Sequence, residues 1–186
     1  MKKLWLFLAA VISLGGCTEI KLVSDYDEVI DKGITEFAEQ FNTHVKNMGD
    51  LAGTPDGTYD ANLKIYNALE SKLDVMIARA SAAADGKGCR LEKKVFDRVK
   101  DLLHDDMPTE MQASDTNQLG NSNGCNERLL ILVKKQLFLV KEIHRNTDKC
   151  GENSLSCLRP ATSKIALSIA NQSINAVSVV EMAKKQ

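Results

Sequence analysis

The sequence predicts an all-α protein, an up-and-down bundle of four long helices plus one short helix. Apolar residues recur at intervals of three and four along most of the chain, and breaks rich in glycine and proline separate these stretches. Aromatic residues make up only 5% of the sequence, which favours helix over sheet. Short breaks between helices are typical of antiparallel neighbours, and hence of an up-and-down bundle.

The first expected helix begins near Ser24 and runs to about Met48. Ser24 followed by Asp27 resembles a capping box, and the break at residues 53–57 (GTPDG) ends the helix. Spacings of three and four place its apolar residues on one face: Tyr26, Ile30, Ile34, Phe37, Phe41, Val45 and Met48.

Two more helices are expected before a polar loop. The second runs from Tyr59 to about Ala80 and ends before the glycine-rich residues 85–88. A shorter third helix is marked by Leu91, Val95, Val99 and Leu102, whereas residues 105–124 have the composition of a loop.

The last two expected helices differ in composition. Residues 129–143 (LLILVKKQLFLVKEI) form the most apolar stretch after the N-terminus, and their charges argue for a central core helix against a second membrane span. Small residues dominate from Pro160 to Ala183, so this helix can approach its neighbours closely. Pro160 suits a first helical position, and Lys184 and Lys185 suit the negative C-terminal end.

The N-terminus has the pattern of a secretory signal. A cationic start (Met1–Lys3) precedes an apolar run from Leu4 to Leu14, which is well short of the ~20 residues that span a bilayer. The residues that follow, Leu14-Gly15-Gly16-Cys17, resemble the lipobox of bacterial lipoproteins. That resemblance implies cleavage after residue 16, lipidation of Cys17 with acyl chains such as palmitate, and attachment to the membrane.

The lipobox resemblance also sets the expected organisation and location. Residues 1–16 form the signal peptide, residues 17–23 the lipidated cysteine with a short tether, and residues 24–186 the bundle. Thr18, where inner-membrane lipoproteins carry Asp, implies the outer membrane of the envelope, with the periplasmic or the cell-surface side left open. A tether of about six residues reaches only about 20 Å, so the start of the first helix should lie near the membrane.

A second resemblance covers most of the mature chain. The block from Lys21 to Phe37 (KLVSDYDEVIDKGITEF), residues 66–80 and residues 180–184 are similar to a group of small helical lipoproteins of proteobacteria. The resemblance implies a helical fold and an envelope location. It implies no activity and no catalytic residue.

The four remaining cysteines predict two disulfides, because their number is even and a secreted protein meets an oxidising compartment. Four cysteines allow three pairings. Cys150 and Cys157 enclose six residues of turn-forming composition and are natural partners, which leaves Cys89 with Cys125. Free buried thiols and a metal site are the alternatives, although no closely spaced cysteine pair of the zinc type is present.

The sequence contains no recognisable catalytic, cofactor or metal motif. Without Lys2 and Lys3, the mature chain has 22 basic and 25 acidic residues, which disfavours nucleic-acid binding. His44, His104 and His144 are not spaced as metal ligands and are expected at the surface or half-buried. The acidic residues 25–31 are expected to form a solvated helix start, not a calcium site.

Two functions remain open. The first is a non-enzymatic envelope protein that binds a protein partner, as an adaptor, an inhibitor or an exclusion-type accessory factor. The alternative is a bundle that binds a small molecule or a metal, with hydrolytic activity conceivable. Its site would lie around the polar residues 171–175 (NQSIN) of the last helix, which otherwise set the bundle register or face water.

Overall fold

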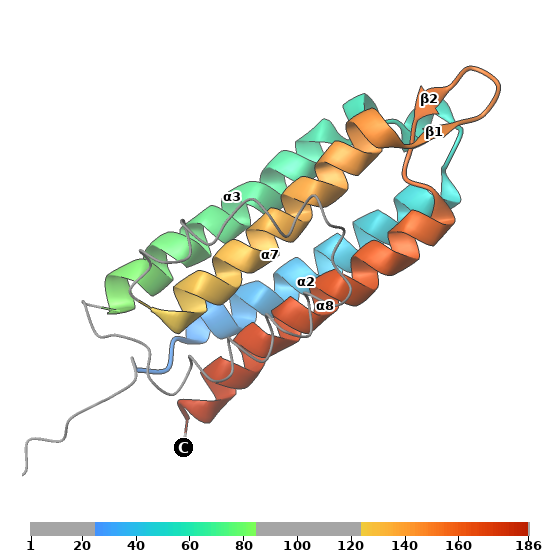
Figure 1. Cartoon of the computed structure of the whole chain (residues 1–186). Helices are drawn as coiled ribbons and strands as arrows, with labels where there is room; N and C mark the ends of the chain where they lie inside the picture. Colours follow the sequence, from blue (N-terminus) through green and yellow to red (C-terminus); the bar gives the residue numbers. More distant parts are fainter. Residues whose placement is uncertain (1–24, 85–123, 186) are drawn as a thin grey trace, which may run out of the picture.

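A computed structural model describes residues 25–84 and 124–185 of the chain. Figure 1 shows four long helices and a small hairpin. The expected short helix at 91–102, the loop at 105–123, the signal peptide and tether, and Ser24 all lie outside the described residues. The described elements are α2 (Glu28–Asp50), the 3-10 turn η1 (Pro55–Gly57), α3 (Tyr59–Ala84), α7 (Cys125–Glu142), the π-helical turn η2 (Ile143–Thr147), β1 (Lys149–Cys150), β2 (Leu155–Ser156) and α8 (Pro160–Ala183).

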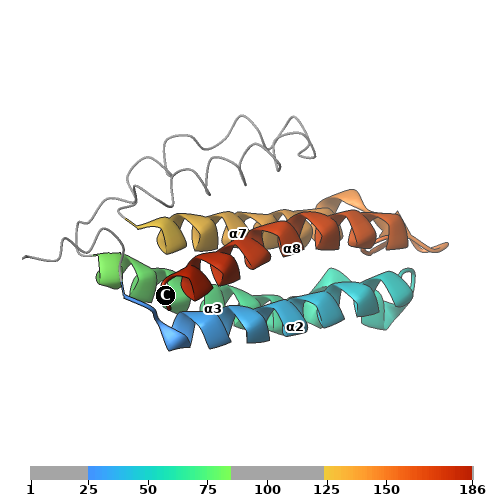
Figure 2. The ribbon, with the colours of Figure 1, turned by 90° about the horizontal axis from the view of Figure 1, so that it is seen from below.

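The four helices form a bundle in which each helix packs against two others. Helix α2 contacts α3 and α8, and α7 contacts the same two helices. Figure 2 shows the arrangement as two layers, α2 with α3 and α7 with α8. The start of α2 lies near the end of α8, where Asp27 N–H donates to Glu181, and the end of α2 lies near the start of α8, where Gly49 approaches Ser163. Helices α2 and α8 therefore run in opposite directions. The colour order in Figure 1 shows the same for α2 and α3, for α3 and α7, and for α7 and α8, as the sequence predicts.

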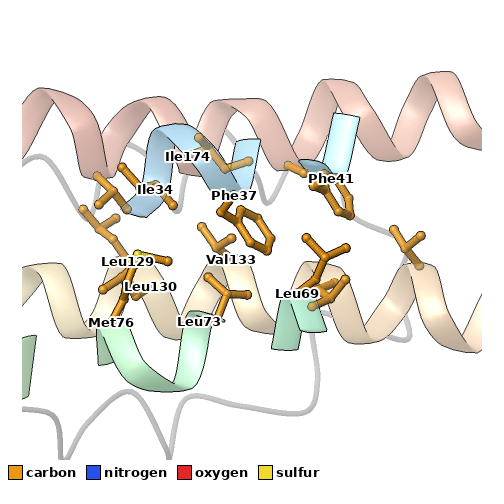
Figure 3. Packing of buried hydrophobic residues seen from close by; sticks show 14 of the residues in the cluster. Ile34, Phe37, Phe41, Leu69, Leu73, Met76, Leu129, Leu130, Val133 and Ile174 are labelled. Atoms are coloured by element: carbon orange, nitrogen blue, oxygen red, sulfur yellow. The ribbon is translucent and has the colours of Figure 1, made fainter. Parts of the chain in front are cut away.

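The core runs along the middle of the bundle. Figure 3 shows side chains from all four helices that meet there, including Phe37, Leu73, Val133 and Ile174. The buried residues of α2 are those of the predicted stripe from Ile30 to Met48, with His44 and Gly49 in addition. Full burial of one large apolar side chain contributes about 1.5–3 kcal/mol, so this shared core is the main source of stability.

The start of α2 corrects the prediction, and α7 begins before its most apolar run. Helix α2 begins at Glu28, and its N-cap is Asp27, whose carboxylate accepts hydrogen bonds from the amides of Val29 and Ile30. Asp27 is therefore the residue that caps the helix, whereas the predicted capping box assigns that role to Ser24. Helix α7 begins at Cys125, four residues earlier than the apolar run at 129–143 indicates.

Two other predictions of helix position are confirmed. Pro160 is the first residue of α8, and the break after α2 contains η1. Helix α7 is the expected core helix, because Phe138 is its only residue classed as exposed.

The bundle has two distinct ends, and each contains polar and charged groups. We call the end at the start of α2 and the end of α8 the Asp27 end. The opposite end, where η1, η2 and the two strands lie, is the hairpin end; both are visible in Figure 1. The two short strands are not predicted by the sequence, which indicates only a turn between Cys150 and Cys157 in the connection between two helices.

Candidate functional site

The hairpin is closed by a disulfide. Strands β1 and β2 are antiparallel, with Lys149 opposite Ser156 and Cys150 opposite Leu155. Cys150 and Cys157 are joined, which confirms the predicted pair. A ladder of two residues on each strand is marginal by itself, so the covalent bond is what closes the loop, with a contribution of about 2.5 kcal/mol in the chain-entropy treatment. Residues 151–154 at its tip are exposed.

The hairpin is also fastened to the start of α3. Gly151 lies against Gly53, and both have positive φ (73° and 88°). A Cβ on Gly151 would lie 3.2 Å from the carbonyl oxygen of Gly53, so neither position accommodates a larger residue without strain. Ser156 Oγ accepts a 3.0 Å hydrogen bond from the amide of Tyr59. The loop between α2 and α3 and the hairpin therefore form one unit.

A buried carboxylate joins the hairpin to the start of α8. Asp148, 7% exposed, accepts hydrogen bonds at Oδ2 from the Arg159 amide (3.0 Å) and from Thr162 Oγ1 (2.9 Å). Arg159 is the N-cap of α8 and provides no side-chain cap of its own. Asp148 thus satisfies polar groups at the helix start that a local cap would otherwise satisfy.

His144 lies beneath the hairpin end, fully buried in the turn η2. Its Nε2 is 2.9 Å from the carbonyl oxygen of Gly57, and its Nδ1 is 2.8 Å from Tyr66 Oη. Because a carbonyl only accepts, Nε2 carries the proton, and Tyr66 donates to Nδ1. Both ring nitrogens are engaged in the neutral imidazole, and burial lowers the pKa of His144 from its ordinary value.

The close packing at Gly57 explains how this carbonyl reaches the core. A Cβ at residue 57 would lie 2.1 Å from the carbonyl oxygen of Leu51. Only glycine fits there, so the turn η1 can press its backbone against the bundle and point the Gly57 carbonyl at His144.

His44 completes a cluster of four rings with Tyr59, Tyr66 and His144. Its ring meets the ring of Tyr66 edge-on at 4.6 Å, and Tyr59 lies 5.6 Å from Tyr66 between ring centroids. Burial, followed by the proximity of His144, lowers the pKa of His44 to about 4. Burial also raises the pKa of Tyr66. At neutral pH the cluster is therefore uncharged.

The positions of His44 and His144 overturn the expectation that the histidines lie at the surface or half-buried. His44 is 4% and His144 0% exposed. The reason is that His44 continues the stripe of Phe37 and Phe41 by three residues, and His144 follows Val140 by four, so both lie on core faces of their helices. His104 lies outside the described residues. The described residues contain no group of three His, Cys, Asp or Glu side chains that could hold a metal ion.

The Asp27 end is built from charged groups. Glu181 of α8 is fully buried and accepts hydrogen bonds from Asp27 N–H (3.0 Å), from Lys184 Nζ (2.9 Å) and from Asn126 Nδ2. Asp27 in turn forms an ion pair with Arg79 of α3. All four helices thus meet at this pair of carboxylates.

Lys185, just after α8, contacts Tyr26 and Asp31 at the start of α2. Lys185 Nζ lies 4.3 Å from the centroid of the Tyr26 ring and 3.2 Å from Asp31 Oδ2, and Tyr26 Oη donates to the same carboxylate at 2.8 Å. The hydrogen bond from Tyr26, together with Lys185, lowers the pKa of Asp31. The acidic residues were predicted to form a solvated helix start, but Asp27 and Asp31 are partly buried and have specific partners.

The polar residues 171–175 of α8 are divided between core and surface. Ser173 is buried and accepts a 2.8 Å hydrogen bond from Gln136 Nε2 of α7, whereas Asn175 is exposed. Gln172 Oε1 is buried without a hydrogen-bond partner. These residues are not gathered at one site. The Gln136–Ser173 bond instead fixes the register of α7 against α8.

Of the four cysteines predicted to form disulfides, three lie among the described residues. Cys125 is the first residue of α7 and is buried, and its sulfur is not a free thiol. Its expected partner Cys89 lies outside the described residues, as does Cys17. Cys150–Cys157 is the one disulfide with both cysteines among the described residues.

No family model, no curated protein and no solved structure matches this chain. Within residues 25–84 and 124–185, no helix is long and apolar enough to cross a membrane.

Proposed function

We propose that this protein is a lipid-anchored protein of the bacterial envelope that binds another protein through its hairpin end. The observation that carries the proposal is the separation of the two ends. The described chain begins at Asp25, at the Asp27 end, only a few residues after the lipobox cysteine Cys17. The hairpin lies at the other end of α2, a helix of 23 residues, or about 35 Å.

The construction of the hairpin end supports a role in binding. Its tip is exposed, while its base is held by a disulfide, by the hydrogen bond from Tyr59 to Ser156 and by the bonds that Asp148 accepts. An ordered loop loses little conformational entropy when a partner docks on it, and this raises affinity. On this proposal the anchor holds the Asp27 end at the membrane, the outer membrane being the expected one, and the tip faces away from it.

The buried ring cluster supports a non-enzymatic role. Both nitrogens of His144 are hydrogen-bonded inside the protein, and His44 is 4% exposed. A general base must reach a substrate proton directly or through one water. Neither imidazole is positioned to do so at the surface.

Palmitate labelling in cells tests the anchor. The wild-type protein should incorporate labelled palmitate and remain in the membrane fraction, and Cys17→Ser should do neither. Continued labelling of the Cys17→Ser protein would contradict the lipoprotein assignment. Thr18→Ser is the matched control, since it changes the neighbouring residue and retains the thiol.

Site-specific photo-crosslinking tests the binding surface. A photoreactive residue at Asn153, in the exposed tip, should crosslink a specific envelope protein, whereas one at Ser71, exposed at the middle of α3, should not. Equal crosslinking from both positions, or none from the tip, would argue against the hairpin end as the binding surface.

We also propose the second disulfide, Cys89–Cys125, and the short helix at 91–102 as parts of this protein. The burial of Cys125 at the start of α7 supports the disulfide. Peptide mapping without reduction should recover Cys89 joined to Cys125. A peptide that joins Cys125 to any other cysteine would refute the pairing.

Small-molecule binding is the second candidate, because several buried polar atoms have no hydrogen-bond partner. His44 Nε2 and Gln136 Oε1 are the clearest, as both residues are about 4% exposed. A ligand that satisfied them would raise the melting temperature of the protein. Native mass spectrometry of protein purified from the envelope distinguishes the candidates, because a bound small molecule adds a discrete mass.

A further inference from the structure

Apolar residues lie along the outer seam between α7 and α8, on the side of these helices away from α2 and α3. The hydrogen bond between Gln136 and Ser173 marks the line at which α7 and α8 face each other. With 3.6 residues per turn, the core residues of both helices lie on one side of that line, and a second apolar set lies on the other. This set defines the outer seam: Leu132 and Leu139 of α7, and Ile165, Ile169 and Val179 of α8.

The middle of the outer seam is shielded from water although it is not part of the core. Leu132 is 8% and Ile169 7% exposed, yet neither belongs to the core cluster of the described residues. Lys135 Nζ and Gln172 Oε1, on the same side of the two helices, are also shielded. Helices α2 and α3 form the other layer, as Figure 2 shows, so they do not cover this side. These exposures are those of a single chain, so a second copy is not their cause.

The chain leaves α3 and returns to α7 at the same point, at one mouth of the seam. Helix α3 ends at Ala84, and a Cβ on Gly124, the N-cap of α7, would lie 2.8 Å from the Cβ of Ala84. Residues 85–123 therefore begin and end at the Asp27 end of the bundle. Cys125 precedes Leu132 by seven residues and Leu139 by fourteen, so these three residues share one line along α7.

The segment 91–102 has the length and the apolar pattern that the seam requires. Its residues Leu91, Val95, Val99 and Leu102 are spaced by four, four and three, which is the pattern of a helix that lies in a groove between other helices. As a helix it would be about 18 Å long, and the stretch of α8 from Ile169 to Val179 is about 15 Å long. One short helix would therefore cover the seam.

We propose that the outer seam of α7 and α8 is the docking surface for residues 91–102, which pack there as the fifth helix of the bundle. This inference rests on the short helix and the Cys89–Cys125 bridge proposed above, and it adds their place in the fold. The bridge would hold residue 89 at the first turn of α7, two residues before Leu91 and in line with Leu132. With the seam occupied from within the chain, the hairpin end is left as the surface for another protein.

Intramolecular photo-crosslinking tests the docking in the full lipidated protein. A photoreactive residue at Val179, which is exposed at the edge of the seam, should crosslink to residues 91–102 after irradiation of intact cells. Mass spectrometry of the purified, digested protein identifies the joined peptides. The matched control is the same photoreactive residue at Val75, which is exposed on α3 in the other layer of the bundle. It should give no crosslink to residues 91–102.

Two variants of the segment test whether its apolar face is what docks. Val95→Ser/Val99→Ser should lower the yield of the Val179 crosslink about tenfold or more, because it removes two side chains from the buried face. Lys93→Ser/Lys100→Ser introduces the same two serines on the opposite face of the expected helix, and should change the yield by less than about twofold. Circular dichroism of both variants checks that the four described helices remain folded.

Four results would overturn the proposal. The first two are no crosslink from Val179 to residues 91–102, and an equal yield from Val75. The third is a crosslink from Val179 that joins two copies of the chain. The fourth is an unchanged yield in Val95→Ser/Val99→Ser. Peptide mapping tests the Cys89–Cys125 bridge separately, and crosslinking from Asn153 tests the binding of a partner, so failure of the docking is distinguishable from failure of either.

Discussion

The two ends of the bundle are closed by different kinds of interaction. At the Asp27 end, the carboxylates of Asp27 and Glu181 connect all four helices through Arg79, Lys184 and Asn126. At the hairpin end, a disulfide, hydrogen bonds between neutral groups and the bonds that the Asp148 carboxylate accepts connect the elements, above a core cluster of uncharged rings.

This difference has a consequence for the cations. At the Asp27 end the positive groups are needed by buried or partly buried carboxylates, since an unpaired buried charge is strongly destabilising. At the hairpin end the buried carboxylate of Asp148 is satisfied mainly by the amide of Arg159 and by Thr162 Oγ1, and the nearest printed cation, Arg159 Nε, lies 3.8 Å away.

Removal of the Glu181 carboxylate should have the largest effect on stability. Glu181→Ala leaves Lys184, which is 4% exposed in its side chain, without its ion-pair partner, and leaves Asn126 and the Asp27 amide without their acceptor. Loss of one partner of a buried pair costs about 3–5 kcal/mol. Urea denaturation should show a loss of this size, and amide exchange should accelerate first at Val29 and Ile30.

Two variants sharpen that result. Glu181→Gln retains an acceptor oxygen and should lose less than Glu181→Ala. Glu36→Ala removes the exposed partner of Lys72 and should change stability by less than about 1 kcal/mol. If Glu36→Ala were as destabilising as Glu181→Ala, the burial of Glu181 would not be the reason for its large effect on stability.

Removal of the hairpin disulfide should have the second largest effect. Cys150→Ser/Cys157→Ser should lower the free energy of unfolding by about 2.5 kcal/mol, the loop entropy for a separation of seven residues. Amide exchange should accelerate at residues 149–157, while the amides at the Asp27 end stay protected. Equal acceleration at both ends would show that the ends are not independent.

Acid should weaken the hairpin end before the Asp27 end. The pKa of His44 is about 4 in the folded protein and about 6.5 in the unfolded chain, so the unfolded state binds the proton first as the pH falls. This linkage predicts a loss of about 2 kcal/mol in the free energy of unfolding between pH 7 and pH 5. His44→Gln should remove most of that dependence.

The carboxylates act in a lower range of pH. The hydrogen bond from Lys141 lowers the pKa of Glu70, and the hydrogen bond from Tyr26 lowers the pKa of Asp31. Such groups stabilise the protein above their unfolded pKa values, near 4, and the stabilisation is lost as the pH falls through their folded values. A slope confined to pH below about 4, and unaffected by His44→Gln, would contradict the assignment to the histidine.

The sequence predicts the helices well because their apolar residues repeat with the period of a helix. The stripe from Ile30 to Met48 and the start of α8 at Pro160 follow from local chemistry alone, and so does the pairing of Cys150 with Cys157 across a short turn. Each of these depends on residues that are near each other in the chain.

The sites were harder to predict because they join residues far apart in the chain. Tyr66 and His144 meet through the packing of α3 against η2, and Glu181 reaches Asp27 across 154 positions. The periodicity did contain a signal for His44, since it falls on the apolar face of its helix. Glu181 follows Val177 by four residues, so the periodicity places it on the core face of α8 as well. Its partners on α2 and α7 could not be predicted, because they are fixed only by the antiparallel register of the bundle.

The smallest predicted effect tests the hydrogen bond at the centre of the ring cluster. Tyr66→Phe retains the ring but removes the donor to His144 Nδ1, and the buried nitrogen has no access to water to replace it. The expected loss is about 1–2 kcal/mol, the range for an unsatisfied buried acceptor. Tyr59→Phe is the matched control, because Tyr59 contributes its ring to the cluster and its amide, not its hydroxyl, to Ser156.

The ¹⁵N chemical shifts of His144 separate this bond from a general loosening of the core. In the wild-type protein Nε2 should carry the proton, because Gly57 offers only an acceptor. In Tyr66→Phe the Nδ1 resonance should move toward that of an unbonded nitrogen, and Nε2 should remain protonated. A change of tautomer in the variant would mean that Tyr66, and not Gly57, selects the protonated nitrogen. An unchanged Nδ1 resonance would mean that the hairpin end does not depend on this bond, and that its disulfide and glycine contact suffice to hold it.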